Sequence, residues 1–185
     1  MSNSYALPIL RTSDLAEAVR VVEVLLEIAD LRDLEVDYEA AVSSPNTLKM
    51  LLELLPYARW YARDGEITSS QASDESSMHL PLRLRALAEP PETVHGFTAT
   101  LNGTPATVRW DFMGWPAAPE IGMDIGGARG AFVTLCINLH DLELEEPASD
   151  HTVYVHVKYF ETQRAHWLAE QVGLQVIGDG VEAPY

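Results

Sequence analysis

The stretch Phe132–Tyr159, FVTLCINLHDLELEEPASDHTVYVHVKY, contains the pattern from which the predicted sheet follows. Apolar residues alternate with others in two runs, which are Val133, Leu135, Ile137 and Leu139, then Val153, Val155, Val157 and Tyr159. A period of two is typical of β-strands. An acidic turn separates the runs, so adjacent antiparallel strands would place both ends of that turn together.

Two further hairpins are predicted upstream. Asn102-Gly103, within residues 94–112, is a strong signal for a two-residue turn that pairs Leu101 with Thr104. Asp64-Gly65 indicates another, with Arg63 opposite Glu66 and Ala62 opposite Ile67. The run Leu80, Leu82 and Leu84 predicts a short strand that shows Arg83 and Arg85 on its outer face, and Pro81 suggests a sheet edge.

Helices are expected in three places. Apolar residues recur at three- and four-residue steps over Ser13–Leu31, after the potential caps Ser13 and Asp14. Ser44-Pro45 has the order expected at a helix start. A last helix is predicted over Thr162–Val172, with Gly173 placed to cap it. The fold class that follows is α+β: one domain over residues 1–185, with a mainly antiparallel sheet built from hairpins and about three helices packed on one side.

Three segments lie between or after these elements. Residues 69–77 are rich in Ser, Asp and Glu and are expected to form a loop. Residues 113–130 are a long stretch rich in Gly and Pro, and such stretches in compact domains usually bind something or move. Its apolar residues, which include Trp115 and Met123, must either pack into the core or form a contact surface. Leu174–Ile177 could be a final strand.

The composition excludes several classes of protein. The 185 residues include 28 acidic and 12 basic side chains, which gives a formal charge of -16. Such a chain would repel nucleic acid, and no apolar run is long enough to span a bilayer. No secretory signal pattern is seen at the N-terminus, and the single cysteine fits a reducing compartment, so we expect a cytoplasmic protein. The oligomeric state is left open.

No motif assigns a reaction or a cofactor. Cys136 lies within an alternating strand and has no cationic neighbours, so it is expected to be a buried, unreactive thiol. The sequence contains no nucleophile elbow and no zinc or calcium motif. We therefore predict no catalytic residues.

An alternative to a non-catalytic role is a metal-dependent enzyme. His140 and Asp141 end one predicted strand, and Asp150 and His151 begin the next. Two imidazoles and two carboxylates around one turn could hold a divalent metal. A second alternative is a small-molecule binding domain, in which residues 113–130 form a lid over the hairpin face.

The acidic turn supports the main hypothesis. Residues 130–157 contain neither Lys nor Arg, whereas the turn carries five carboxylates: Asp141, Glu143, Glu145, Glu146 and Asp150. Such a patch can steer a basic protein partner onto its surface. We therefore expect a small cytosolic binding protein of immunity or antitoxin type, which neutralises a basic partner, such as a nuclease-type toxin, by occlusion. Trp115 and Met123 complete the expected partner surface.

Overall fold

A computed structural model describes residues 4–73, 80–128 and 131–183. Its helices, among these residues, are α1 (Leu15–Ile28), α2 (Pro45–Leu54), α3 (Ser69–Ser73), α4 (Thr93–Thr100) and α5 (Thr162–Gln171). Its main strands are β1 (Ser4–Thr12), β2 (Glu35–Val42), β3 (Arg59–Ala62), β4 (Gly65–Ile67), β5 (Leu82–Glu89), β6 (Ala106–Asp111), β9 (Phe132–Ile137), β10 (His151–Lys158) and β11 (Val181–Ala183).

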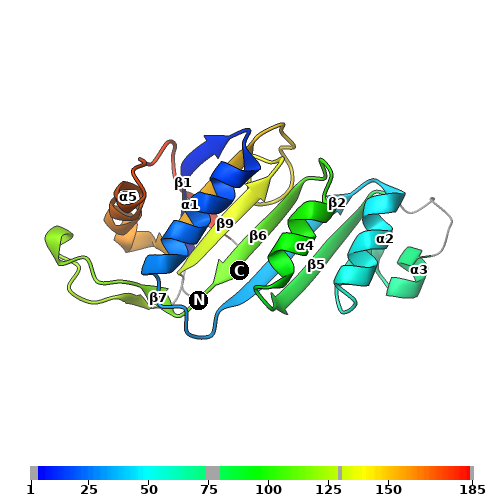
Figure 1. The fold of residues 1–185 in the computed structure, drawn as a ribbon, viewed down its shortest axis with the longest axis horizontal. Helices are drawn as coiled ribbons and strands as arrows, with labels where there is room; N and C mark the ends of the chain where they lie inside the picture. Colours follow the sequence, from blue (N-terminus) through cyan, green and yellow to red (C-terminus); the bar gives the residue numbers. More distant parts are fainter. Residues whose placement is uncertain (1–3, 74–79, 129–130, 184–185) are drawn as a thin grey trace.

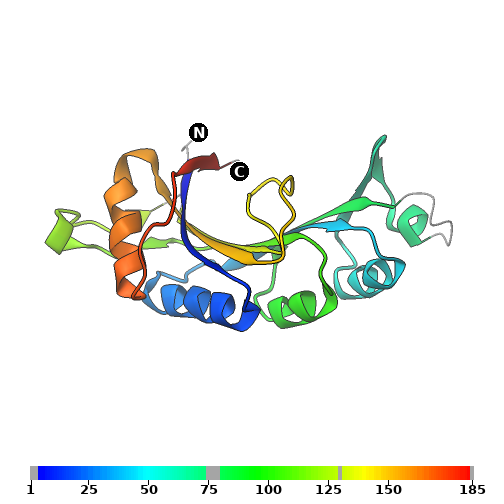
Figure 2. The same ribbon diagram turned by 90° about the horizontal axis from the view of Figure 1, so that it is seen from above.

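These nine strands form one antiparallel sheet in the order β11-β1-β10-β9-β6-β2-β5-β3-β4. The helices α1, α2 and α4 lie side by side on one face (Figure 1). The opposite face carries the segment between β9 and β10 (Figure 2). The α+β class with an antiparallel sheet is therefore confirmed, but the described chain has five helices rather than about three, because residues 69–73 and 93–100, expected as loop and strand, form α3 and α4. The helices α3 and α5 lie at the two ends of the sheet (Figure 1).

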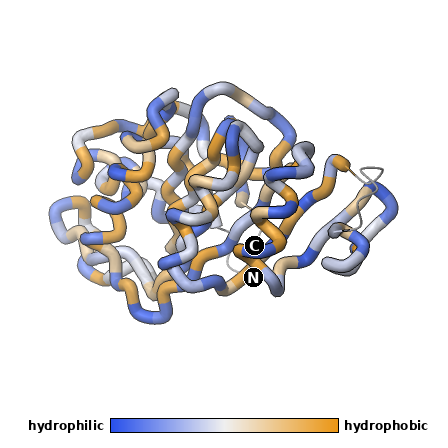
Figure 3. The backbone as a smooth tube through the Cα atoms, turned by 45° about the vertical axis from the view of Figure 1, so that its right-hand side comes forward, coloured by the Kyte–Doolittle hydropathy of each residue, from blue (hydrophilic) through white to orange (hydrophobic). Residues whose placement is uncertain are grey.

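Alternating apolar residues position the sheet against this helical layer. The side chains of Val36, Tyr38 and Ala40 in β2 are fully buried toward the helices, whereas Asp37 and Glu39 point to the other face. The colouring by hydropathy shows the same alternation along the strands (Figure 3). Because side chains of a strand alternate between faces, the residues left over from the core line the helix-free face.

The first two helices begin as the sequence predicts. Asp14 caps α1 by accepting hydrogen bonds from the backbone N–H groups of Ala16 and Glu17 at 2.9 and 3.3 Å. Ser44 caps α2 and accepts from the N–H of Thr47 at 3.5 Å. Each cap satisfies an N–H that the helix itself cannot pair.

The expected hairpin over residues 94–112 is wrong in its first half. Residues 93–100 form helix α4, and Phe97 and Leu101 are buried four residues apart. Asn102 and Gly103 have positive φ angles of 42° and 84°, so this dipeptide ends a helix instead of turning a hairpin. Within the alternating run 97, 99 and 101, Phe97 and Leu101 also fit a helical spacing, whereas Ala99 is exposed in the structure. Packing of α4 against α2 favours the helix.

Three other strand predictions also need correction. In the β3–β4 hairpin Tyr61 faces Glu66 and Ala62 faces Gly65, so the turn lies one residue earlier than Asp64-Gly65. Strand β5 lies inside the sheet and not at its edge, because it pairs with both β2 and β3. It begins at Leu82, so Pro81 lies outside the strand. Residues 174–177 are not a strand, and the final strand is β11. Within the described residues, three pairs of consecutive strands in this sheet are also neighbours: β3–β4, β6–β9 and β9–β10.

The polar and the glycine-rich segments both contain structure. Residues 69–73 of the expected loop 69–77 form α3, and residues 74–79 lie outside the described residues. Residues 113–128 form a ribbon of β7 (Gly114–Trp115) and β8 (Gly127–Ala128), joined through a short 3-10 turn. No helix in the described part of the chain is long and apolar enough to cross a membrane.

Candidate binding groove on the helix-free sheet face

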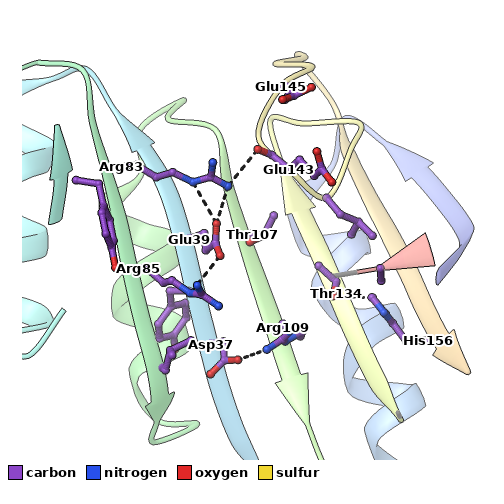
Figure 4. A pocket seen from close by; sticks show the side chains of 15 residues that line it. Asp37, Glu39, Arg83, Arg85, Thr107, Arg109, Thr134, Glu143, Glu145 and His156 are labelled. Carbon is purple, nitrogen blue, oxygen red and sulfur yellow. Dashed lines mark hydrogen bonds and ion pairs between the residues drawn. The ribbon is translucent and has the colours of Figure 1, made fainter. Parts of the chain in front are cut away.

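A groove of about 490 Å³ lies on the helix-free face of the sheet. Its floor consists of side chains from β5, β2, β6, β9 and β10, and its wall is the turn between β9 and β10 (Figure 4). This volume lies in the range of small-molecule sites, which span about 300–1,000 Å³. The groove is therefore large enough for a small ligand or for a side chain of a partner.

Charged side chains from neighbouring strands pair across the floor. Glu39 accepts hydrogen bonds from Arg83 at 3.2 and 2.8 Å, and its other carboxylate oxygen lies 3.5 Å from Nε of Arg85. Arg109 forms an ion pair with Asp37, which also accepts the backbone N–H of Ala88 at 2.9 Å. The strand register produces these contacts, because Glu39 faces Arg85 and Asp37 faces Arg109.

Two of these guanidinium groups have donors without acceptors. The Nε atoms of Arg85 and Arg109 are buried, and neither has a hydrogen-bond partner among the described residues. The guanidinium of Arg109 also lies over the ring of Phe132, with its central carbon 5.1 Å from the ring centroid. Buried polar atoms are nearly always paired in proteins, so these donors mark a place where an acceptor is missing.

A buried polar chain closes one end of the groove. His156 shares hydrogen bonds with the hydroxyls of Thr134 at 2.8 Å and Ser4 at 3.2 Å. Burial, with the nearby charge of Arg109, lowers the pKa of His156 to about 3. The imidazole is therefore neutral at physiological pH and is a poor general base, because a base acts best when its pKa is near the working pH.

The acidic turn is folded around the carboxylate of Asp141. This carboxylate accepts the backbone N–H groups of Glu143, Glu145 and Glu146. The carbonyl of Asp141 in turn accepts from the thiol of Cys136 at 3.2 Å. One side chain thus holds the three glutamates that follow it in a fixed backbone arrangement.

Apolar contacts and an arginine also fix the turn. Leu142 and Leu144 pack against a small cluster that contains Cys136 and Tyr154. The hydroxyl of Tyr154 donates to the carbonyl of His140 at 2.5 Å. Arg83 donates to the carbonyl of Glu143 at 3.2 Å and so links the turn to the groove floor.

The three glutamates of the turn have no ion-pair partner among the described residues, and all three are exposed. A second hollow of about 170 Å³ lies between the turn and β11, with Asp141, Leu142, Glu143, Glu145, Glu146, Val181 and Glu182 around it. Among the described residues that line this hollow, every charged one is acidic. The hollow therefore presents carboxylates to a positively charged group of a second molecule.

The expected metal ligands lie near one another but have separate roles. His140 bonds to Asp150, and this hydrogen bond lowers the pKa of that carboxyl. His151 accepts the backbone N–H of Asn138 at 3.0 Å, and burial lowers its pKa. Asp141 is occupied by the turn. Within the described residues, no three His, Cys, Asp or Glu side chains are placed to hold a metal ion.

Two expected partner residues lie away from the groove. Trp115 is buried, with 2% of its surface exposed, and its Nε1 donates to the carbonyl of His156 at 2.7 Å. Met123 lies in the ribbon, where it pairs with Ala118 through backbone hydrogen bonds of 2.7 and 3.0 Å. The described part of segment 113–130 contributes no lining residue to the groove, so it does not cover that face. Apolar burial explains the position of Trp115.

The structure buries Cys136 fully, as expected, and burial raises the pKa of its thiol well above the usual value. The sequence predicts that Arg83 and Arg85 share a face, but not the groove that they form with Asp37, Glu39 and Arg109. The signal for the groove that the sequence does contain is the placement of acidic residues at alternate positions of β2 and of basic residues at alternate positions of β5. Only the strand order, which brings β2 between β5 and β6, places them together.

Comparison of the chain with family models, curated proteins and solved structures gives no match.

Proposed function

We propose that this chain is a non-enzymatic binding protein that captures a basic partner protein on the acidic turn 141–146. The observation that carries the proposal is the 170 Å³ hollow beside the turn, in which all the charged residues of the described lining are acidic. A lysine or arginine side chain of a partner fits this chemistry. The backbone of the turn is already held by Asp141, so the turn should lose little conformational entropy when a partner binds.

The net charge supports the same proposal at longer range. A formal charge of -16 attracts a cationic protein over distances set by the ionic strength, and it raises the association rate. Complementary charge of this kind gives specificity and speed more than affinity. The expected partner is therefore a strongly basic protein.

The finer form of the proposal is an immunity or antitoxin role in the cytoplasm. A toxin that acts on nucleic acid needs a basic surface, and an acidic protein that covers this surface would block it. Neutral, fully engaged His156 and buried Cys136 favour binding over catalysis, since neither is poised to take a proton or attack a substrate.

The experiment compares capture by the wild type with capture by two triple variants. One variant carries Glu143→Gln, Glu145→Gln and Glu146→Gln. Its matched control loses the same charge from exposed positions on the helical side of the sheet, with Glu23→Gln, Glu27→Gln and Glu53→Gln.

Each protein is immobilised and exposed to native lysate at low and at physiological salt, and bound proteins are identified. We expect the wild type and the helical control to retain the same basic protein, and the turn variant to lose it. Retention of that protein by the turn variant, or capture of no basic protein at low salt, contradicts the proposal. If the captured protein is a nuclease, equimolar wild-type chain is expected to stop its cleavage of DNA or RNA.

A further inference from the structure

We infer that the floor of the groove binds a carboxylate through Arg85, and that its ligand carries a single carboxylate on a neutral or cationic remainder. This inference goes beyond the capture of a basic partner. It concerns the floor of the 490 Å³ groove, whereas the proposed function rests on the separate hollow beside the acidic turn.

Arg85 is the least engaged of the three arginines on the floor. Its Nε is buried without a hydrogen-bond partner among the described residues, and the nearest carboxylate oxygen, from Glu39, is 3.5 Å away. Glu39 directs its hydrogen bonds to Arg83 instead, at 3.2 and 2.8 Å. Arg83 is engaged further by the carbonyl of Glu143. Asp37 engages Arg109, although the Nε of Arg109 also lacks an acceptor. Arg85 is therefore the floor arginine whose guanidinium forms no hydrogen bond among the described residues, and it can pair with an incoming acceptor.

The charge balance of the floor favours an anion. Among the described residues of the floor, three arginines (Arg83, Arg85 and Arg109) face two carboxylates (Asp37 and Glu39), which leaves one positive charge in excess. A carboxylate matches a guanidinium in shape as well as in charge, because its two oxygens can accept two parallel N–H bonds. One bound carboxylate would neutralise the floor and pair with the guanidinium of Arg85, whose side chain is 39% exposed.

The wall of the groove limits what else the ligand can carry. Glu143 and Glu145 line it, and the whole chain has a charge of -16. A second anionic group would meet these carboxylates, while a neutral or cationic group would not. The chemistry therefore fits an amino-acid-like small acid or the C-terminal end of a peptide, and excludes phosphates and other polyanions.

The test uses three probes and reads the arginine side chains directly. The probes are acetate, the tripeptide triglycine, and triglycine amide, which lacks the carboxylate. Each is titrated into the full chain at constant ionic strength while the Nε–H signal of Arg85 is followed by NMR. The variant is Arg85→Gln, and the matched control is Arg59→Gln, which removes an exposed arginine paired with Arg85 on β3 but outside the groove lining.

We expect triglycine to shift the Arg85 signal saturably and triglycine amide to bind at least tenfold more weakly. Arg85→Gln should weaken triglycine at least tenfold, and Arg59→Gln should leave it within twofold. Acetate that binds as tightly as triglycine indicates a free small acid, and acetate tenfold weaker indicates a peptide end; both support carboxylate recognition.

The inference is overturned if the amide binds as well as the acid, if neither acetate nor triglycine binds saturably, or if Arg85→Gln leaves the affinity for triglycine unchanged. Circular dichroism shows whether the variant folds, and the wild-type titration decides alone if it does not. Loss of the basic partner in the capture experiment leaves these results unaffected, so failure of the proposed function is distinguishable from failure of this inference.

Discussion

His156 and Arg164 are two polar residues that this fold buries almost completely, with 3% and 1% of their surface exposed. Both make several hydrogen bonds, as buried polar groups must. His156 connects β1 and β9 through the hydroxyls of Ser4 and Thr134. Arg164 connects α5 to the ribbon of residues 113–128. Because the two residues connect different elements, the contribution of each to the free energy of unfolding can be measured separately.

The buried imidazole of His156 predicts a pH dependence of stability. Its folded pKa is about 3 and its ordinary value is 6.5, so between these values the unfolded chain binds the proton and the folded chain does not. Stability is therefore lost as the pH falls below about 6.5. From pH 7 to pH 5 the imidazole should contribute a loss of about 2 kcal/mol.

Urea unfolding of the wild type and of His156→Gln at pH 7, 6 and 5 measures this contribution. The difference between the two free energies of unfolding should shrink by about 2 kcal/mol over that range. A difference that stays constant with pH would mean that the pKa of His156 is the same in the folded and the unfolded chain, which contradicts the prediction.

The guanidinium of Arg164 predicts a large stability loss on its removal. It donates to the carboxylate of Glu161 at 3.0 Å and to the carbonyls of Pro116 and Ile125. Arg164→Met would leave a largely buried carboxylate and two carbonyls without their donor. Breaking a buried pair in this way typically costs about 3–5 kcal/mol.

Thermal unfolding and hydrogen exchange check this prediction. The exchange of backbone amides at 114–128 should rise, since the ribbon loses its link to α5. Arg32→Met is the matched control, because Arg32 pairs with Asp30 at the surface, and it should leave stability unchanged. Equal effects of the two substitutions would show that the buried pair does not anchor the ribbon.

At the scale of elements, local patterns predicted those strands and helices whose apolar residues allow one interpretation. Strands β9 and β10 follow from a period of two over long runs, and α1 and α2 follow from a period of 3.6 with a cap. Residues 94–101 allow both periods, and the Asn102-Gly103 signal is shared by hairpins and helix ends.

The groove depends on contacts that no local pattern contains. Arg85, Glu39 and Thr107 lie on three strands that are distant in sequence, and they share one row of the sheet only because β2 lies between β5 and β6. The acidic turn was predicted, since its residues are contiguous. The role of Asp141 was not, because its backbone contacts depend on the path of the turn.

The acidic turn predicts the effect of Asp141→Ala. Loss of the carboxylate removes the acceptor for the N–H groups of Glu143, Glu145 and Glu146, so the turn should loosen while the sheet stays folded. Hydrogen exchange should rise at 143–146, and partner capture should fall with it. Protection at 143–146 that equals the wild type would show that the apolar contacts of Leu142 and Leu144 hold the turn without Asp141.

At the scale of the molecule, the charge of -16 destabilises the compact state through self-repulsion. Salt screens this repulsion, with a Debye length of about 30 Å at 0.01 M and about 8 Å at 0.15 M ionic strength. The melting temperature should therefore rise by a few degrees when sodium chloride is increased from 10 to 150 mM. A fall over this range would mean that stabilising ion pairs, such as those of Glu39, outweigh the net repulsion.

Capture of a basic protein by the acidic turn should depend on the charges of Glu143, Glu145 and Glu146. This dependence is tested by the dissociation constant of the captured partner, measured between 50 and 300 mM salt for the wild type, the 143/145/146 glutamine variant and the 23/27/53 control. We predict that the turn variant binds at least tenfold more weakly at 50 mM and shows a flatter salt dependence, while the control stays close to the wild type. Equal weakening by both variants would contradict the claim, because net charge alone would then account for the binding.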